Sequence, residues 1–181
     1  LGVMDATGNG VPQDYATASQ WWEKAAAQDN ANAQIKLGIM YYIGTGVPQD
    51  YAVARGWYEK AAAQGDADAQ YLLGSLYATG NGVPQDYAMA RQWYEKSAAQ
   101  GNANGQDSLG RMYLAGRGVQ QDNVRAYMWF SLAVEQYLRK SEKGTETAQR
   151  RDAIAKELAP AQIAEVQRLS QQCQTQQFKG C

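Results

Sequence analysis

Several residue types that support catalysis or metal binding are scarce in this chain of 181 residues. Histidine is absent, which excludes histidine general bases, Ser-His-Asp triads and the most common metal ligand. The only two cysteines, Cys173 and Cys181, both lie close to the C-terminus. We therefore expect no metal site, no cofactor and no disulfide bond that staples the whole fold.

Neither an excess of one charge nor a long apolar run is present. The chain has 17 Lys and Arg against 18 Asp and Glu, which gives a net charge of −1. Nucleic-acid binding requires clustered positive charge, so this balance argues against a nucleic-acid partner. No run approaches the roughly 18 apolar residues of a membrane helix, and we expect no membrane span.

What the sequence does contain is a repeat of 36 residues. Three blocks, 15–50, 51–86 and 87–122, abut without a gap, and each neighbouring pair is identical at 22 of 36 positions. Residues 1–14 match the end of the same unit, and a weaker pattern continues beyond 122. A fixed period of this length is typical of a stacked array of helical or mixed repeats.

Each unit is predicted to fold as two helices. In the best example, Asp50 is a suitable N-cap for a helix that ends before Gly65, and Asp66 is a suitable N-cap for the next helix. Apolar residues recur at helical spacing in both segments, and a Gly- and Pro-containing loop, 80–84, follows. Asp66 and Asp68 could be posed as a catalytic acidic pair, but Asn stands at the equivalent positions of other units, so capping is the better interpretation.

The domain organisation follows from the repeat. We expect an array over 1–140, with units that start near residues 29, 65 and 101. A long helix, 123–140, ends the array, and helices over 146–158 and 160–174 form a C-terminal cap within 141–175. The segment 176–181 is expected to be a disordered tail.

A glycine lies inside the second helix of every unit, at Gly38, Gly74 and Gly110. Such a glycine costs about 1 kcal/mol relative to alanine, so we expect a packing reason, namely the close approach of a neighbouring helix. A tryptophan also recurs at the same period. We interpret this series as core residues rather than a ligand-binding ladder, and Trp22 as an aromatic packing variant. The members are Trp21, Trp57, Trp93 and Trp129.

The unit resembles the Sel-one-like repeat (SLR), a relative of the tetratricopeptide repeat. The motif is A-x-x-x-L-G-x-x-Y-x-x-G-x-G-V-x-x-D followed by A-x-x-W-Y-x-K-A-A-x-x-G, and the resemblance covers roughly residues 1–136. In the second unit it rests on Ala69, Leu73, Gly74, Tyr77, Gly80, Gly82, Val83, Asp86, Ala90, Trp93, Tyr94, Lys96, Ala98 and Gly101. One departure is Asp5, which occupies the tyrosine position of later units.

The resemblance implies an all-α, right-handed superhelix (solenoid) that acts as a protein-binding scaffold with a concave groove. Some bacterial SLR proteins neutralise secreted effector toxins, such as lipases delivered by type VI secretion, so an immunity protein is one hypothesis. An envelope or cytoplasmic adaptor is the alternative. A β-lactam-binding or hydrolysing enzyme is a minor alternative, but the Ser-x-x-Lys pair of that chemistry is absent from all seven serines. We therefore expect a non-enzymatic protein.

The compartment is predicted only weakly by the sequence. The chain starts with Leu1, inside the repeat pattern, and we interpret it as a trimmed form of a longer chain. The periplasm is the expected location, with the cytoplasm as the alternative.

The candidate partner-binding residues lie in the second helix of each unit, where positions that differ between units alternate with invariant ones. In related helix-pair repeats this helix lines the inner curve. An apolar stripe at these positions is unusual for a free surface, which favours a binding role over neutral drift. The predicted set has an apolar N-terminal half and a charged C-terminal half: Ile35, Ile39, Tyr42, Ile43, Tyr71, Leu72, Asp107 and Arg111.

Overall fold

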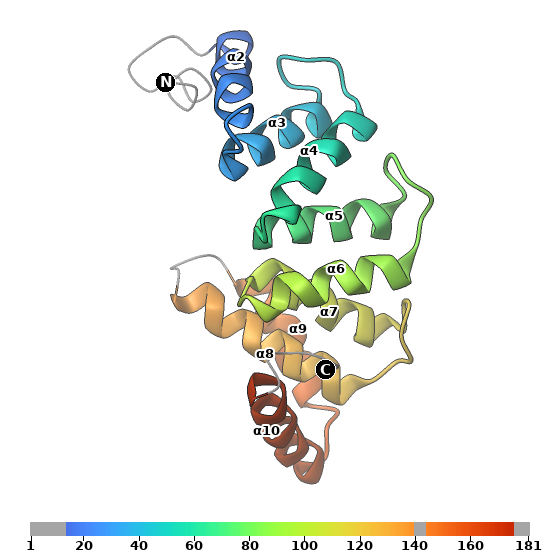
Figure 1. The fold of residues 1–181 in the computed structure, drawn as a ribbon. Helices are drawn as coiled ribbons and strands as arrows, with labels where there is room; N and C mark the ends of the chain where they lie inside the picture. Colours follow the sequence, from blue (N-terminus) through green and yellow to red (C-terminus); the bar gives the residue numbers. More distant parts are fainter. Residues whose placement is uncertain (1–13, 140–143, 176–181) are drawn as a thin grey trace. The chain divides into compact units, whose positions relative to one another are not determined.

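The computed structural model describes residues 14–139 and 144–175, and its secondary structure over these residues is helical throughout, with turns and loops between helices. The chain divides into two compact units, 1–85 and 86–181, which are described separately. Unit 1 contains α2 (Tyr15–Ala26), α3 (Ala31–Ile43), α4 (Tyr51–Ala63) and α5 (Ala67–Thr79) (Figure 1). Unit 2 contains α6 (Tyr87–Ala99), α7 (Ala103–Ala115), α8 (Asn123–Arg139), α9 (Thr145–Ala155) and α10 (Pro160–Thr175).

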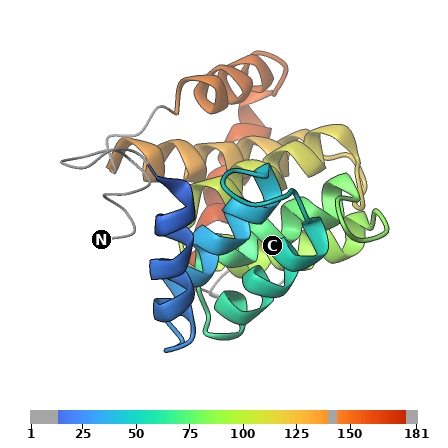
Figure 2. The same ribbon diagram turned by 90° about the horizontal axis from the view of Figure 1, so that it is seen from above.

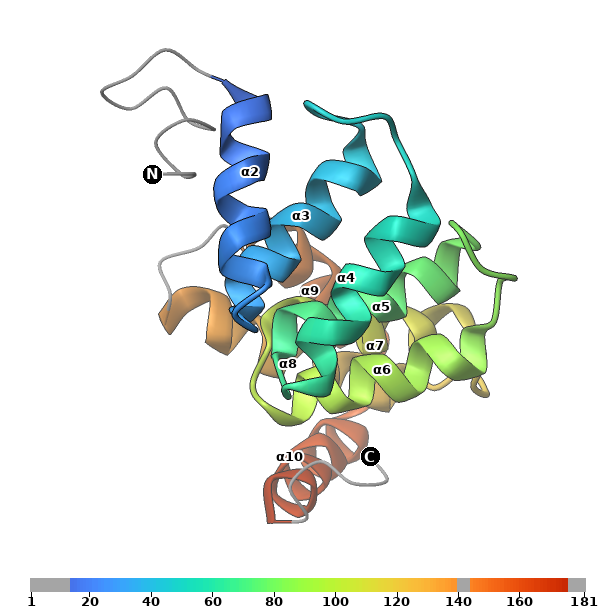
Figure 3. The same cartoon turned by 45° about the horizontal axis from the view of Figure 1, so that its top comes forward.

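Helices that are consecutive in the sequence pack against one another inside each unit. In unit 1, α3 lies between α2 and α4, and α4 in turn packs on α5 (Figure 3). In unit 2, α7 packs between α6 and α8, and α8 also contacts α10. The long helix α8 contacts α9 as well, and these two helices are seen side by side in Figure 2. No helix of the described residues is both long and apolar enough to cross a membrane. The same residues contain no cluster of acidic or cysteine side chains suited to a metal ion.

The helix boundaries follow from the capping residues that the sequence provides. Oδ1 of Asp50 accepts hydrogen bonds from the backbone N–H groups of Ala52 and Val53, at 2.9 and 3.0 Å. Asp66 caps α5 in the same way, so the capping interpretation of this residue is confirmed. Gly65, between the two helices, adopts a left-handed φ of 88°. Each such N-cap contributes about 1 kcal/mol by pairing N–H groups that the helix leaves unsatisfied.

The glycines inside the second helices allow close contact with an aromatic ring. A Cβ atom on Gly38 would lie 2.3 Å from Cε1 of Tyr58 on α4. A Cβ atom on Gly110 would lie 2.6 Å from Cδ1 of Phe130 on α8. The predicted packing reason is confirmed at these two positions, and both rings are about 99% or more buried.

The loops after the second helices also fit against an aromatic residue. Gly46, Gly82 and Gly118 have φ values of 75°, 72° and 68°. A Cβ atom on Gly82 would lie 2.7 Å from Cβ of Tyr51, the first residue of α4. Gly46 approaches Tyr15 and Gly118 approaches Tyr87 with the same geometry. Each loop therefore holds the start of the preceding helix pair, and glycine is required by both the φ angle and the space.

Only one of the four periodic tryptophans is fully buried in the core. Trp129 is fully buried, as predicted, but Trp21 is 38% exposed and Trp57 and Trp93 are half-buried. In α2, α4 and α6 a lysine three residues later lies over the indole ring, at 4.7, 4.2 and 4.0 Å from its centroid. The prediction of a core residue in every unit is therefore wrong for Trp21. Trp22, by contrast, packs against the cluster of Ala26, Ala33 and Leu37, as expected for a packing variant.

The C-terminal helices begin and end close to the predicted positions. The helix expected over 146–158 is α9, Thr145–Ala155, and the helix expected over 160–174 is α10, Pro160–Thr175. Cys173, on α10, is 3% exposed, and its Sγ lies 3.8 Å from Sδ of Met128 on α8. The expected tail, 176–181, and the N-terminal positions Leu1 and Asp5 lie outside the described residues.

Candidate protein-binding site

Three of the predicted binding residues line one pocket of unit 1. Tyr42 comes from the end of α3, and Tyr71 and Leu72 come from the first half of α5. Tyr58 of α4 and Ser75 of α5 complete the lining, and the pocket has a volume of about 200 Å³. A pocket of this size suits one side chain of a partner rather than a whole ligand, because small-molecule sites usually measure about 300–1,000 Å³.

The hydroxyl groups of this pocket differ in whether they form hydrogen bonds inside unit 1. Tyr58 is only 1% exposed, yet among the described residues no hydrogen bond is formed by its hydroxyl. Burial raises the pKa of Tyr58 above its ordinary value, and nearby Tyr42 adds to the rise, so the phenol stays neutral. The Tyr42 hydroxyl accepts a hydrogen bond of 3.0 Å from Nδ2 of Asn81. Because Tyr58 lines the pocket, its hydroxyl is open to water there, and a ligand that fills the pocket must replace that water with its own polar group.

The other apolar candidates of unit 1 have different surroundings. Ile43 is 61% exposed at the end of α3, and Ile39 is half-buried one turn earlier. Ile35 is only 7% exposed, so its predicted place on an exposed stripe is wrong. The physical reason is that α3 packs against both α2 and α4, which leaves little of its surface open. Ile39 and Ile43 are accessible for a partner, whereas Ile35 belongs to the core.

The charged candidates, Asp107 and Arg111, form an ion pair on α7 of unit 2. Oδ2 of Asp107 lies 2.5 Å from Nη2 of Arg111. Oδ1 accepts a 2.7 Å hydrogen bond from Oγ1 of Thr147 and lies 3.6 Å from Nη1 of Arg150, both on α9. Asp107 is 3% exposed, so its predicted role as an exposed contact is wrong. Its carboxylate instead holds α9 against α7 within unit 2.

Arg111 remains accessible, with 55% of its side chain exposed. It belongs to a polar pocket of about 450 Å³ between α7, the end of α8 and α9. In this pocket the Tyr137 hydroxyl donates to Oδ1 of Asn104 at 2.8 Å, and Arg150 pairs with Glu146 at 3.1 Å. The polar groups therefore satisfy one another, which is the arrangement of a helix-anchoring network.

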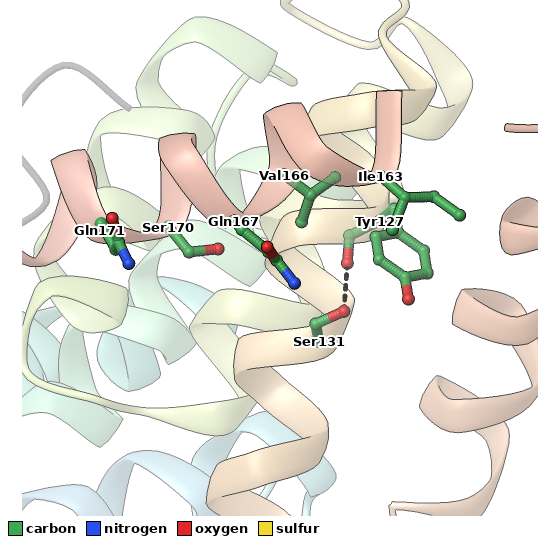
Figure 4. A pocket seen from close by; sticks show the side chains of 7 residues that line it. All are labelled: Tyr127, Ser131, Ile163, Val166, Gln167, Ser170 and Gln171. Atoms are coloured by element: carbon green, nitrogen blue, oxygen red, sulfur yellow. Dashed lines mark hydrogen bonds between the residues drawn. The ribbon is translucent and has the colours of Figure 1, made fainter. Parts of the chain in front are cut away.

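A third pocket, of about 440 Å³, lies between α8 and α10 of unit 2 (Figure 4). Ile163 and Val166 of α10 and Tyr127 of α8 provide its apolar surface. Ser131 donates a 2.8 Å hydrogen bond to the backbone carbonyl of Tyr127, so this serine is used within its own helix. None of the predicted binding residues lines this pocket.

Sequence reasoning missed Tyr58 and Ser75 in unit 1, and Thr147 and Arg150 in unit 2. Tyr58 occupies a position that is aromatic in every unit, which marks it as core and conceals its open hydroxyl. Ser75 belongs to a position that changes from Ile39 to Ser75 to Arg111, and that variation is a signal for a surface role. Thr147 and Arg150 lie outside the repeat, where no comparison between units is possible.

The helix pairs with a fixed period of 36 residues define the α-solenoid class of repeat proteins. A family model described as the Sel1 repeat matches residues 1–30, 31–66, 67–102 and 103–138. The chain therefore belongs to the Sel1 repeat family, which confirms the predicted resemblance and fold class. No curated protein matches the chain significantly.

Two solved bacterial structures share the fold. One is a protective antigen of uropathogenic Escherichia coli that displays an SLR fold, with a TM-score of 0.71 and 42% identity over 74% of this chain. The other is a Sel1 repeat protein from Oxalobacter formigenes, with a TM-score of 0.66 and 36% identity over 75% of this chain. The match spans 29% and 56% of those two chains. Sel1 repeat proteins are generally protein-interaction scaffolds, and the fold is typically non-catalytic.

Proposed function

We propose that this chain is a non-catalytic scaffold that binds a partner protein through the pocket of Tyr42, Tyr58, Tyr71, Leu72 and Ser75. The observation that carries the proposal is the open aromatic pocket itself, in which the Tyr58 hydroxyl forms no hydrogen bond with any described residue. Exposed Ile43 and half-buried Ile39 lie on the helix that supplies Tyr42, and they add apolar surface that gains about 25 cal/mol per Å² when buried. Family membership supports a scaffold role.

The test is binding calorimetry with a partner identified by pull-down from the native host and mass spectrometry. Tyr42→Ala and Tyr71→Ala are expected to weaken binding by about 2 kcal/mol or more, as for interface hot spots. Glu59→Ala and Lys60→Ala are matched controls, because both side chains are exposed on α4 and neither lines the pocket. A loss of binding in the two controls, with none in the tyrosine variants, would place the interface elsewhere.

The partner class that we propose is a secreted antibacterial effector, which would make the chain an immunity protein in the periplasm. Support comes from the family resemblance, and from the E. coli relative, whose description as a protective antigen favours an envelope location. An adaptor role in the envelope or cytoplasm is the alternative. Co-expression with a toxin encoded next to this gene decides between them: rescue of growth supports immunity, and unchanged toxicity supports the adaptor.

We further propose that the chain does not hydrolyse β-lactams. The absence of a Ser-x-x-Lys pair and of histidine removes the groups that would activate a serine nucleophile. Incubation of the purified chain with nitrocefin is expected to give no colour change above buffer. Turnover that scales with protein concentration would contradict this statement.

A further inference from the structure

We infer that the unit 1 pocket receives an arginine side chain of the partner. The inference rests on the proposed function and names the chemistry of the residue that enters the pocket. The lining consists of three tyrosines, Leu72 and Ser75, with no charged side chain. Tyrosine rings attract cations by cation–π interactions, and guanidinium is the cation that is most easily desolvated against an aromatic surface.

The hydroxyl groups in the pocket match the needs of a guanidinium group. Arginine has five N–H donors and no acceptor, so a desolvated arginine requires oxygen atoms around it. The Tyr58 hydroxyl has no hydrogen bond among the described residues, and the same is true of the Ser75 side-chain hydroxyl. Both oxygens therefore have lone pairs that a partner's N–H groups can use. An aliphatic side chain would leave the buried Tyr58 hydroxyl unsatisfied.

The charge of unit 1 also favours a basic partner. Residues 1–85 contain four Lys and Arg but eight Asp and Glu, whereas residues 86–181 contain 13 and 10. Complementary charge speeds encounter and disfavours wrong partners, although exposed charges contribute little affinity themselves. A basic peptide is therefore attracted to the unit that carries the aromatic pocket, and an acidic peptide is repelled from it.

Unit 2 shows that arginine and tyrosine already pair inside this repeat. The guanidinium of Arg125 lies 5.6 Å from the ring centroid of Tyr113, and that of Arg117 lies 5.9 Å from that of Tyr87. At the unit 1 positions equivalent to these two arginines the sequence has Val53 and Asn81. The tyrosines of those two unit 1 positions are Tyr41 and Tyr51, which lie outside the pocket, so the comparison shows only that the packing of this repeat accommodates arginine–tyrosine pairs.

The experiment selects ligands for the full chain from a random 12-residue peptide library displayed on phage. We expect arginine to be enriched, and the strongest synthetic peptide to bind with saturation in calorimetry. Replacement of its arginine by citrulline, which has the same shape without the charge, is expected to weaken binding about tenfold or more. Equal affinity of the arginine and citrulline peptides would overturn the inference.

Protein variants locate the arginine in the pocket. Tyr58→Phe removes only the hydroxyl, and Phe130 at the same position of α8 shows that phenylalanine packs against the helical glycine. We expect about fivefold weaker binding of the arginine peptide, with an unchanged thermal midpoint. Tyr94→Phe, the equivalent change in unit 2, is the matched control and is expected to leave the Kd unchanged. Unaltered binding by Tyr58→Phe would overturn the inference.

The failures of the two proposals are distinguishable. Selected peptides that carry Leu or Phe instead of Arg, and that lose affinity on Tyr71→Ala, would overturn the arginine inference and leave the scaffold proposal in place. Selected peptides whose binding is unaffected by both Tyr42→Ala and Tyr71→Ala would overturn both. Arginine enrichment together with loss of binding on Tyr58→Phe and Tyr71→Ala supports both.

Discussion

The same repeat position has opposite uses in the two units. Tyr71 on α5 lines an aromatic pocket, whereas Asp107, the equivalent residue on α7, is buried and holds α9 through Thr147 and Arg150. The difference teaches that variation between repeats has two sources. In unit 1 the variable position lines an open pocket, and in unit 2 it provides an internal anchor for a segment outside the repeat.

The largest expected effect concerns the anchor of unit 2. Asp107→Ala removes the buried carboxylate that Thr147, Arg111 and Arg150 share, and the loss of hydrogen bonds to a charged group costs about 1.5–3 kcal/mol of unfolding free energy. Urea denaturation measures the loss, and hydrogen exchange should show faster opening of α9 than of α6. Glu59→Ala, which breaks an exposed pair with Arg55 at 3.3 Å, is the control and should cost about 0.5 kcal/mol or less. Equal losses in the two variants would contradict an anchoring role for Asp107.

The next effect tests a glycine–aromatic contact that occurs inside each of the two units. Gly38→Ala in unit 1 and Gly110→Ala in unit 2 place a methyl group against Tyr58 and Phe130, and each is expected to cost about 1–3 kcal/mol. Gly56→Ala in α4 is the matched control, because no atom lies within 4 Å of its Cβ position. This control should stabilise the protein by about 0.5–1 kcal/mol, because alanine favours the helix. Thermal melts show whether each variant has a lower or a higher melting temperature than the original protein. A lower melting temperature for Gly56→Ala would show that the helix faces are misassigned.

A smaller effect compares equivalent N-caps. Asp50 caps α4, and Asp122 accepts a 2.9 Å hydrogen bond from the backbone N–H of Arg125 at the start of α8. Replacement of either residue by alanine is expected to lower the unfolding free energy by about 1 kcal/mol. Chemical denaturation of the two variants should give similar midpoints. A loss at one site only would show that capping is not shared between the units.

The smallest effect concerns the lysine over a partly exposed tryptophan. Lys60→Gln removes a cation that lies 4.2 Å from the ring centroid of Trp57. An exposed cation–π contact contributes about 0.5 kcal/mol, so the denaturation midpoint should fall only slightly. Lys96→Gln, which removes the lysine over Trp93 in unit 2, should lower the denaturation midpoint by the same amount. A change above 1 kcal/mol in either variant would indicate a contact that the geometry does not show.

Local features of the fold were predictable from the sequence, because the repeat displays them several times. Asp50 and Asp66 were identified as caps, and Gly38 and Gly110 as sites of close packing, from residue type and position alone. The expected helices beyond residue 122 also agree with α8, α9 and α10 to within a few residues. Each of these features depends on neighbours a few residues away, or on the same position in the next unit.

The site was less predictable, because its contacts join segments that no local pattern connects. Asp107 was expected on an open surface, since nothing in α7 reveals that Thr147 and Arg150 return to it from α9. Ile35 was expected to be exposed, since the helix pattern alone does not show that α3 is covered on two sides. Tyr58 stands at a position that is aromatic in every unit, which is typical of a core residue; this holds for its ring, whereas its hydroxyl faces the pocket. Whether the predicted residues bind a partner stays a prediction.

The glycine loops that fit over Tyr15, Tyr51 and Tyr87 have an evolutionary consequence. Each 36-residue copy contains both partners of this contact: the tyrosine at the start of its first helix and the glycine in the loop after its second helix. Tandem duplication or deletion of a whole copy therefore preserves the joint, whereas an indel of a few residues breaks it. An array built in this way can change length in whole steps of 36 residues.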